Sequence, residues 1–235
     1  MGPHIDKFWP IGPRDSAVEG DFIVSANRLS VILLAVMFLF AAAQCVVRLA
    51  GGGAFDLTSD IDRLENSLSA IAYTSPEPTH APAYDGAIYQ VSFRTCPPCV
   101  QAHRELLPKL RAAGIETRLV TTAQRSSSTA DERAAVVENA RRKDWAFTQD
   151  WWADNSPRRF YAQTELPLIE GDRLREAELE RLQGHVSELA EVLASNGERF
   201  GFPAFFWRTS TGAYKAAVGY SPALEGVILA DMKQE

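Results

Sequence analysis

The chain has 235 residues, enough for one ordinary domain with additional segments, and 46% of them are hydrophobic, so it can bury a core. Its net charge of -6 excludes the basic surface that nucleic-acid binding needs. Three cysteines are too few for a disulfide-stapled scaffold or a four-ligand zinc site, and we expect neither a metal nor a cofactor.

The N-terminal segment is predicted to be a polar tail followed by a membrane anchor. Residues 1–28 are polar, contain three prolines and show no periodicity. The nineteen residues from Leu29 to Val47 are uncharged and strongly apolar, and at ~1.5 Å per residue such a helix spans a bilayer core. We therefore predict an uncleaved transmembrane helix over 29–50. The alternative is a signal peptide cleaved at Ala41-Ala42-Ala43, but the long preceding region and the apolar residues that follow argue against it.

Residues 51–85 are predicted to be a stalk and linker. An apolar seam with alternating spacings of four and three residues indicates a short helix, formed by Leu57, Ile61, Leu64, Leu68 and Ile71. We favour a helix that lies on the chain's own globular domain. The alternative is a short coiled coil that makes a homodimer, helped by the membrane tether. Pro76, Pro78 and Pro82 then indicate a semi-rigid polyproline II tether.

Residues 86–235 are predicted to form one α/β domain. Strands are expected over 86–93, 115–122, 203–208 and 214–220. Helices are expected over 96–113 with an interruption at Pro108, over 130–152, over 176–196 and over 222–233. The long helical stretch between the second and third of these strands is therefore an insertion.

The motif Cys96-Pro97-Pro98-Cys99 stands where the first strand of this domain meets its first helix. The free N–H groups and the dipole of a helix N-terminus favour a thiolate, so Cys96 is predicted to be the attacking nucleophile and Cys99 the resolving thiol. Neither proline has an N–H, so Cys99 supplies the first backbone donor that can reach the sulfur of Cys96. We therefore expect a less stabilised thiolate, partly compensated by the charge of Arg94. We therefore expect such a centre to reduce or isomerise substrate disulfides rather than to act as a strong oxidant.

A second proline signal lies about 100 residues further on, in Gly201-Phe202-Pro203-Ala204 at the start of the third strand. We predict a cis peptide at Pro203, in a loop that packs against the cysteines and binds extended substrate. Phe202, Pro97 and Pro98 are the predicted substrate contacts, because Phe202 can join an exposed apolar patch beside the cysteines.

Together these features resemble the catalytic domain of the bacterial periplasmic disulfide isomerases of the DsbC/DsbG family, in the thioredoxin superfamily. The likeness spans residues 86–235 and includes Gly114-Ile115-Glu116-Thr117-Arg118, Trp145-Ala146-Phe147, Phe200-Gly201-Phe202-Pro203-Ala204 and Val218-Gly219-Tyr220-Ser221-Pro222. It implies a thioredoxin-like α/β fold with a helical insertion between the second strand and the cis-proline strand. It also implies that Cys96 is the nucleophile, Cys99 the resolving thiol and Pro203 the cis-proline.

The chain departs from that family in three places, and from many thioredoxins in a fourth. The Pro-Pro dipeptide is more familiar from thioredoxin-like reductases of the TlpA type, and Phe202 replaces a threonine common before the cis-proline. The amino-terminal dimerisation domain of the isomerases is replaced by the membrane segment and the apolar seam. Gln90 falls where many thioredoxins bury an acid that helps to deprotonate the resolving cysteine.

The sequence thus predicts a membrane-anchored thiol–disulfide oxidoreductase that reduces or isomerises disulfides in exported proteins. We expect a single-pass protein of the inner membrane with its catalytic domain in the periplasm, re-reduced there by a membrane thiol donor. Two other hypotheses remain: an adaptor subunit of a membrane assembly, and a copper chaperone of thioredoxin fold, since two thiolates suit Cu(I). His103, one turn beyond Cys99, is predicted to be a surface or packing residue.

Overall fold

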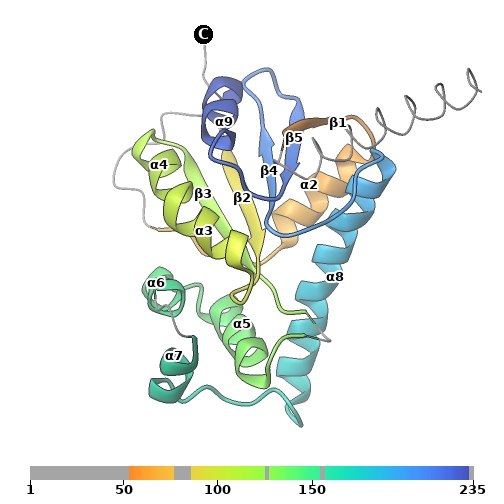
Figure 1. Ribbon diagram of the computed structural model, residues 1–235. Helices are drawn as coiled ribbons and strands as arrows, with labels where there is room; N and C mark the ends of the chain where they lie inside the picture. Colours follow the sequence, from red (N-terminus) through yellow and green to blue (C-terminus); the bar gives the residue numbers. More distant parts are fainter. Residues whose placement is uncertain (1–52, 77–85, 125–126, 154–156, 233–235) are drawn as a thin grey trace, which may run out of the picture. The chain divides into compact units, whose positions relative to one another are not determined.

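The computed structural model describes residues 53–76, 86–124, 127–153 and 157–232 (Figure 1). The predicted polar tail and transmembrane helix, residues 1–50, and most of the proline-rich tether lie outside these residues. Within the described ranges, no helix has the length and apolar character needed to cross a membrane.

The described strands form one mixed sheet in the order β1-β5-β4-β2-β3. Their bounds are β1 Phe55–Leu57, β2 Ala87–Ser92, β3 Glu116–Thr121, β4 Ala204–Arg208 and β5 Tyr214–Val218. The β2–β3 pair is parallel, whereas the β2–β4, β4–β5 and β1–β5 pairs are antiparallel. All residues of β2 are buried, as expected for a central strand covered on both faces.

Helices cover both faces of this sheet (Figure 1). On one face, α2 Ile61–Ala70 and α8 Arg173–Ser195 pack against the strands through an apolar core that includes Leu64 and Leu193. On the other face, α3 Pro97–Glu105, α4 Leu107–Ala112 and α9 Leu224–Met232 share a core with Phe205 of β4. The predicted α/β class is therefore confirmed.

The helical insertion lies between β3 and β4 and comprises α5 Ala130–Arg142, α6 Trp145–Ala153, α7 Pro157–Gln163 and α8. In Figure 1, α5, α6 and α7 gather beyond the end of the sheet at which α3 begins. Their core contains Trp151 and Trp152, both fully buried, and Cys96 and Cys99 belong to the same apolar cluster. The cysteines therefore lie where the insertion meets the sheet.

Side-chain N-caps mark the starts of two of the insertion helices, α5 and α8. The hydroxyl of Thr129 caps α5, and the carboxylate of Asp172 caps α8 by accepting from two backbone N–H groups of its first turn. Caps of this kind stabilise a helix by about 1 kcal/mol. Arg175 of α8 also donates to Glu138 of α5 at 2.9 Å, and this partly buried ion pair joins the two helices.

The structure extends the domain upstream of residue 86, the boundary predicted from sequence. The short strand β1, which was not predicted, pairs with β5, and Leu57, Leu64, Leu68 and Ile71 of the apolar seam are buried in the domain core. The helix thus lies on its own domain, as favoured, and these side chains are not exposed to form a coiled coil. A seam of this spacing fits a coiled coil and an amphipathic surface helix equally well, and here the apolar stripe of α8 provides the partner.

Other boundaries differ by a few residues, each for a local reason. The helix predicted over 96–113 is broken at Leu106, two residues before Pro108, because Pro108 has no N–H to donate to the carbonyl one turn earlier and its ring crowds that carbonyl. The helix predicted over 130–152 ends at Arg142, where Lys143 adopts a left-handed conformation before α6 begins. Helix α7 was not predicted.

Candidate active site

Cys96 and Cys99 form a disulfide at the N-terminus of α3. Cys96 is the N-cap residue, and its Sγ accepts a hydrogen bond from the backbone N–H of Cys99 at 3.3 Å. Pro97 and Pro98 fill the first two helical positions and offer no N–H. The first backbone donor to the Cys96 sulfur is therefore Cys99, as predicted. Both cysteines are buried, with 5% of Cys96 and none of Cys99 exposed, so Cys96 is the more exposed of the two.

The loop before β4 lies beside the motif. Ala204 pairs with Val91 of β2, which brings Pro203 next to the residues that lead into Cys96. The Phe202–Pro203 peptide bond is cis, as predicted, and the carbonyl of Pro203 accepts from Gly219 N at 2.8 Å. Gly201 is required by close packing, because a Cβ there would lie 2.9 Å from Val218 Cγ1.

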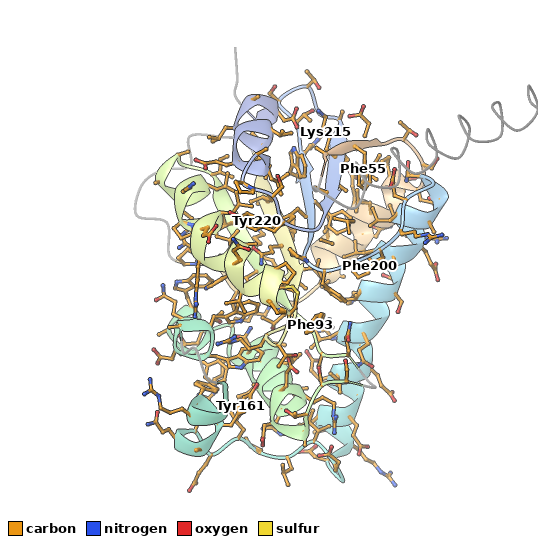
Figure 2. All side chains as sticks on the ribbon, viewed as in Figure 1. Phe55, Phe93, Tyr161, Phe200, Lys215 and Tyr220 are labelled. Atoms are coloured by element: carbon orange, nitrogen blue, oxygen red, sulfur yellow. A yellow bond between two sulfur atoms is a disulfide. The ribbon has the colours of Figure 1, made fainter. Side chains whose placement is uncertain are left out.

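Three partly exposed phenylalanines form a row at this end of the sheet, which we call the phenylalanine row: Phe93, Phe202 and Phe200. Phe202 is the middle member, with its ring centroid 4.9 Å from that of Phe93 and 5.1 Å from that of Phe200, both edge to face. It packs against the apolar cluster that contains the two cysteines. Figure 2 labels Phe93 at the end of β2 and Phe200 on the loop before β4. The row gives an apolar surface beside the disulfide.

Gln90 lies buried on β2 behind the motif. Its Nε2 donates to Ser92 Oγ at 2.7 Å and to the carbonyl of Cys99 at 3.3 Å. Its Oε1 has no hydrogen-bond partner within the described part of the chain. The amide therefore positions the first turn of α3 but, being neutral, cannot take a proton from Cys99.

Arg94 is buried, two residues before Cys96, and it contacts the helical insertion. Its Nε donates to the carbonyl of Trp151 in α6 at 2.9 Å, and its guanidinium carbon lies 5.8 Å from the centroid of the Trp152 ring. The insertion therefore holds Arg94, whose charge was expected to compensate for the N–H donors that Pro97 and Pro98 lack.

Glu132 is a site residue that sequence reasoning missed. It is fully buried in the first turn of α5, and its carboxylate accepts hydrogen bonds from the backbone N–H and the hydroxyl of Thr95, the residue before Cys96. The available signal was the pattern Thr129-x-x-Glu132, which is typical of a capping box. Half of that box is present, since Thr129 Oγ1 accepts from Glu132 N at 3.1 Å, but the glutamate side chain points to Thr95 instead.

His103 is largely buried among aromatic rings, as a packing residue. Its ring centroid lies 4.9 Å from that of Trp152 and 6.0 Å from that of Trp145. Its pKa is lowered to about 4, mainly by burial and in smaller part by the positive charges of Arg111, Arg94 and Arg104. In the described ranges, no group of three or more His, Cys, Asp or Glu side chains is arranged to hold a metal ion.

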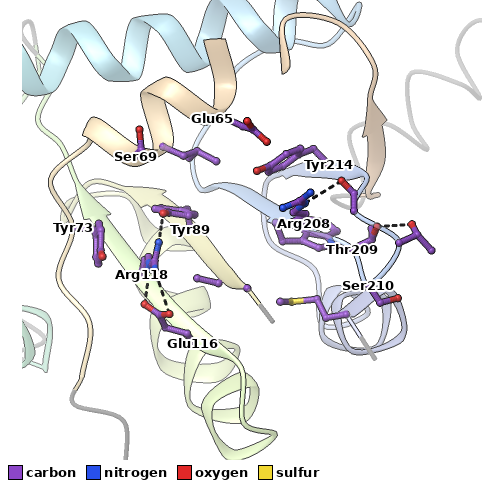
Figure 3. A pocket seen from close by; sticks show the side chains of 17 residues that line it. Glu65, Ser69, Tyr73, Tyr89, Glu116, Arg118, Arg208, Thr209, Ser210 and Tyr214 are labelled. Atoms are coloured by element: carbon purple, nitrogen blue, oxygen red, sulfur yellow. Dashed lines mark hydrogen bonds and ion pairs between the residues drawn. The ribbon is translucent and has the colours of Figure 1, made fainter. Parts of the chain in front are cut away.

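Two hollows flank the domain core. The smaller, of about 480 Å³, runs beside the motif and is lined by Arg94, Thr95, Pro97, Val100, Gln101, Arg104 and Glu105. The larger, of about 920 Å³, includes Gly86 and Ala87 at the start of β2, whereas Cys96 follows the end of that strand. Figure 3 shows Arg118 in it, paired with Glu116 and lying between the rings of Tyr73 and Tyr89. Only the smaller hollow adjoins the cysteines.

No family model matches the sequence, and no curated protein matches it in sequence. Among solved structures, it is similar to a periplasmic thioredoxin-like protein from Salmonella enterica serovar Typhimurium, with a TM-score of 0.50 and 14% identity, covering 74% of this chain and 98% of that one. It is also similar to Proteus mirabilis ScsC in a transitional conformation, with a TM-score of 0.51 and 13% identity, covering 92% of this chain and 97% of that one. The chain therefore has a thioredoxin-like fold, as predicted, and identities this low establish the fold alone.

Proposed function

We propose that the chain is a thiol–disulfide oxidoreductase that reduces or isomerises disulfides in exported proteins. The observation that carries the proposal is the Cys96–Cys99 disulfide at the N-terminus of a helix, with Cys96 at the N-cap and the more exposed of the two cysteines. The thioredoxin-like fold supports the same assignment. The narrower kinship with DsbC/DsbG isomerases is a proposal that rests on the sequence resemblance.

In the proposed reaction, the Cys96 thiolate attacks one sulfur of a substrate disulfide. A bond forms between Cys96 and that sulfur, the substrate S–S bond breaks, and the second substrate sulfur leaves as a thiolate. Cys99 then attacks the Cys96 sulfur, which closes the Cys96–Cys99 disulfide and releases the first substrate sulfur. Two electrons have passed from the cysteine pair to the substrate. In isomerisation the freed substrate thiolate attacks a second substrate disulfide instead. The thiolate released from that disulfide attacks the substrate sulfur bound to Cys96, which forms a new substrate disulfide and releases the Cys96 thiolate, so no electrons are transferred overall.

The phenylalanine row and the smaller hollow support binding of extended, apolar substrate segments beside Cys96. Phe202 lies in contact with the cluster that holds the cysteines, and Pro97 lines the smaller hollow. A substrate chain crossing Cys96 would place apolar side chains on the row and remove both surfaces from water. Burial of a large apolar side chain is worth about 1.5–3 kcal/mol.

The electrostatics of the motif favour reduction or isomerisation over strong oxidation. A hydrogen bond to a thiolate stabilises the reduced form, and here the two prolines leave Cys99 N–H as the first backbone donor. A centre that reduces substrates must itself be re-reduced by a dithiol donor. An anchor over residues 29–50 in the inner membrane, with this domain in the periplasm, would bring it to a membrane thiol donor; this location is a proposal from sequence. Because the apolar seam is buried in the domain, we do not propose a coiled-coil homodimer.

The test is the equilibrium reduction potential of the full-length chain in mild detergent, titrated against dithiothreitol and glutathione buffers. Cys45→Ala should be the background, so that only Cys96 and Cys99 react with the alkylating reagent, and Cys96→Ser is the control. A potential of about -200 to -270 mV supports a reductase, and one of about -120 to -180 mV supports an isomerase or oxidant. A pair that never cycles between dithiol and disulfide would refute the redox function and favour an adaptor role.

A further inference from the structure

A buried carboxylate is attached to the residue that immediately precedes the proposed nucleophile. Glu132 Oε1 accepts from the backbone N–H of Thr95 at 3.1 Å, and Thr95 Oγ1 lies 3.2 Å from Oε1 and 3.1 Å from Oε2. Glu132 has no exposed surface, so water does not screen its charge from its neighbours. It belongs to α5, and the contact joins the insertion directly to the redox motif.

Hydrogen-bond donors are also scarce in the residues next to Cys96. Both hydrogen-bond donors of Thr95 point to Glu132, while Pro97 and Pro98 have none to offer. An anion close to a thiol disfavours its ionisation, because the thiolate would bring a second negative charge into the same poorly solvated region. The two effects act in the same direction on Cys96.

Arg94 supplies a positive charge close to Cys96 in the sequence, and it also contacts the insertion. Arg94 donates to the carbonyl of Trp151, and the indole Nε1 of Trp151 donates to the Tyr161 hydroxyl at 3.1 Å. The pKa of Tyr161 is raised to about 12 mainly by burial; the charge of Glu132 and, less, that of Asp131 contribute to this rise, while the hydrogen bond from Trp151 and the charge of Arg94 oppose it. Glu132 and Arg94 therefore act on the same group of residues with opposite signs.

We infer that Glu132 is a positioning residue that holds Thr95 and disfavours the Cys96 thiolate, and thereby makes the Cys96–Cys99 dithiol a stronger reductant. This inference rests on the proposed redox function. Reduction adds two electrons to the disulfide and gives a thiolate or thiol at Cys96 and a thiol at Cys99; in the test the electrons come from dithiothreitol. A less stable thiolate makes the reduced state less stable, so the pair passes electrons to a substrate more readily.

Glu132→Gln is the decisive variant, because it removes the charge and keeps one oxygen that can accept from Thr95, while an NH2 group replaces the second oxygen. Asp131→Asn is its matched control: Asp131 is the preceding residue in the same helical turn but is exposed, so its charge is screened. Both are made in the full-length chain with the Cys45→Ala background. The readouts are the equilibrium constant with dithiothreitol and the pH at which Cys96 ionises, followed by thiolate absorbance.

We expect Glu132→Gln to shift the equilibrium about tenfold toward the reduced protein, which is about 30 mV, and to move Cys96 ionisation to lower pH. Asp131→Asn should leave both unchanged. Thr95→Val, which loses the hydroxyl but keeps the charge, should change the equilibrium less than Glu132→Gln and also tests for simple damage to the loop. The inference is overturned if Glu132→Gln matches the parent in both readouts, or if Thr95→Val reproduces its effect. A parent protein that does not cycle at all would instead refute the redox function itself.

Discussion

Replacing Pro98 with alanine should stabilise the Cys96 thiolate, whereas replacing Pro97 should not. In the structure Cys96 is the N-cap of α3, Pro97 is N1, Pro98 is N2 and Cys99 is N3. An N-cap side chain accepts hydrogen bonds from the N–H groups of N2 and N3. Only the N3 bond is present, from Cys99 at 3.3 Å. Pro98→Ala restores the missing N2 donor, while Pro97→Ala adds an N–H at N1, which does not point at the cap.

The expected size follows from that one bond. A hydrogen bond to a charged group contributes about 1.5–3 kcal/mol, and one pKa unit corresponds to about 1.4 kcal/mol. Pro98→Ala should therefore lower the pKa of the Cys96 thiol by about one to two units. The same free energy shifts the equilibrium with dithiothreitol about tenfold to a hundredfold toward the reduced protein, or about 30–60 mV.

The assay is equilibration of the full-length chain, in the Cys45→Ala background, with dithiothreitol buffers, then acid quenching, alkylation and mass spectrometry. Loss of a proline also loosens the unfolded chain, but by about 0.4–1 kcal/mol in both redox states, so it cancels from the redox equilibrium. Pro97→Ala is the control for that effect. If both variants have the same potential, the argument from missing backbone donors is wrong.

Three further predictions concern substrate binding, packing and pH. Phe202→Ser should reduce kcat/KM several-fold for an apolar peptide disulfide and leave the reduction of oxidised glutathione nearly unchanged; equal losses on both substrates would show that the phenylalanine row does not bind substrate. Trp152→Ala should destabilise the domain by about 3–5 kcal/mol in urea unfolding, because Trp152 is fully buried, whereas the partly exposed Trp145 should tolerate alanine better. The pKa of His103 is lowered from 6.5 to about 4 by burial, so the unfolded chain binds the additional proton and stability should fall as pH drops from about 6.5 to about 4. The loss should approach about 3 kcal/mol, and unfolding curves of His103→Gln should lack this part of the pH dependence if the assignment is right.

Much of the local structure of the redox motif could be predicted from residues that are close together in the sequence. The strand before Cys96, the helix after it and the N–H groups that Pro97 and Pro98 lack depend on neighbours within one helical turn. The loop at Pro203 was also recognisable from the residues around it. Each of these expectations was met because propensity, capping and proline geometry act over a few residues, and packing reinforces them.

The N-terminal boundary of the domain could not be predicted from the local sequence pattern. The apolar seam from Leu57 to Ile71 had the right period for a stalk and for a surface helix, and only the presence of α8 decided between them. Strand β1 is three residues long, too short to show alternation, and exists because β5 offers it an open edge.

The charges around the nucleophile were likewise decided by the tertiary structure. Sequence alone identified the residues that touch Cys96 along the chain, and it assigned Arg94 as the charge that acts on the sulfur. Packing of the insertion turned Arg94 toward Trp151 and brought Glu132 to Thr95 across 37 positions of sequence. The capping-box pattern would place the Glu132 side chain at the N-terminus of its own helix. Its contact with Thr95 forms only because α5 packs against the redox motif. The sequence motif therefore identifies the redox centre. The electrostatic environment of that centre depends on contacts between segments that are distant in the sequence, and no local sequence pattern predicts them.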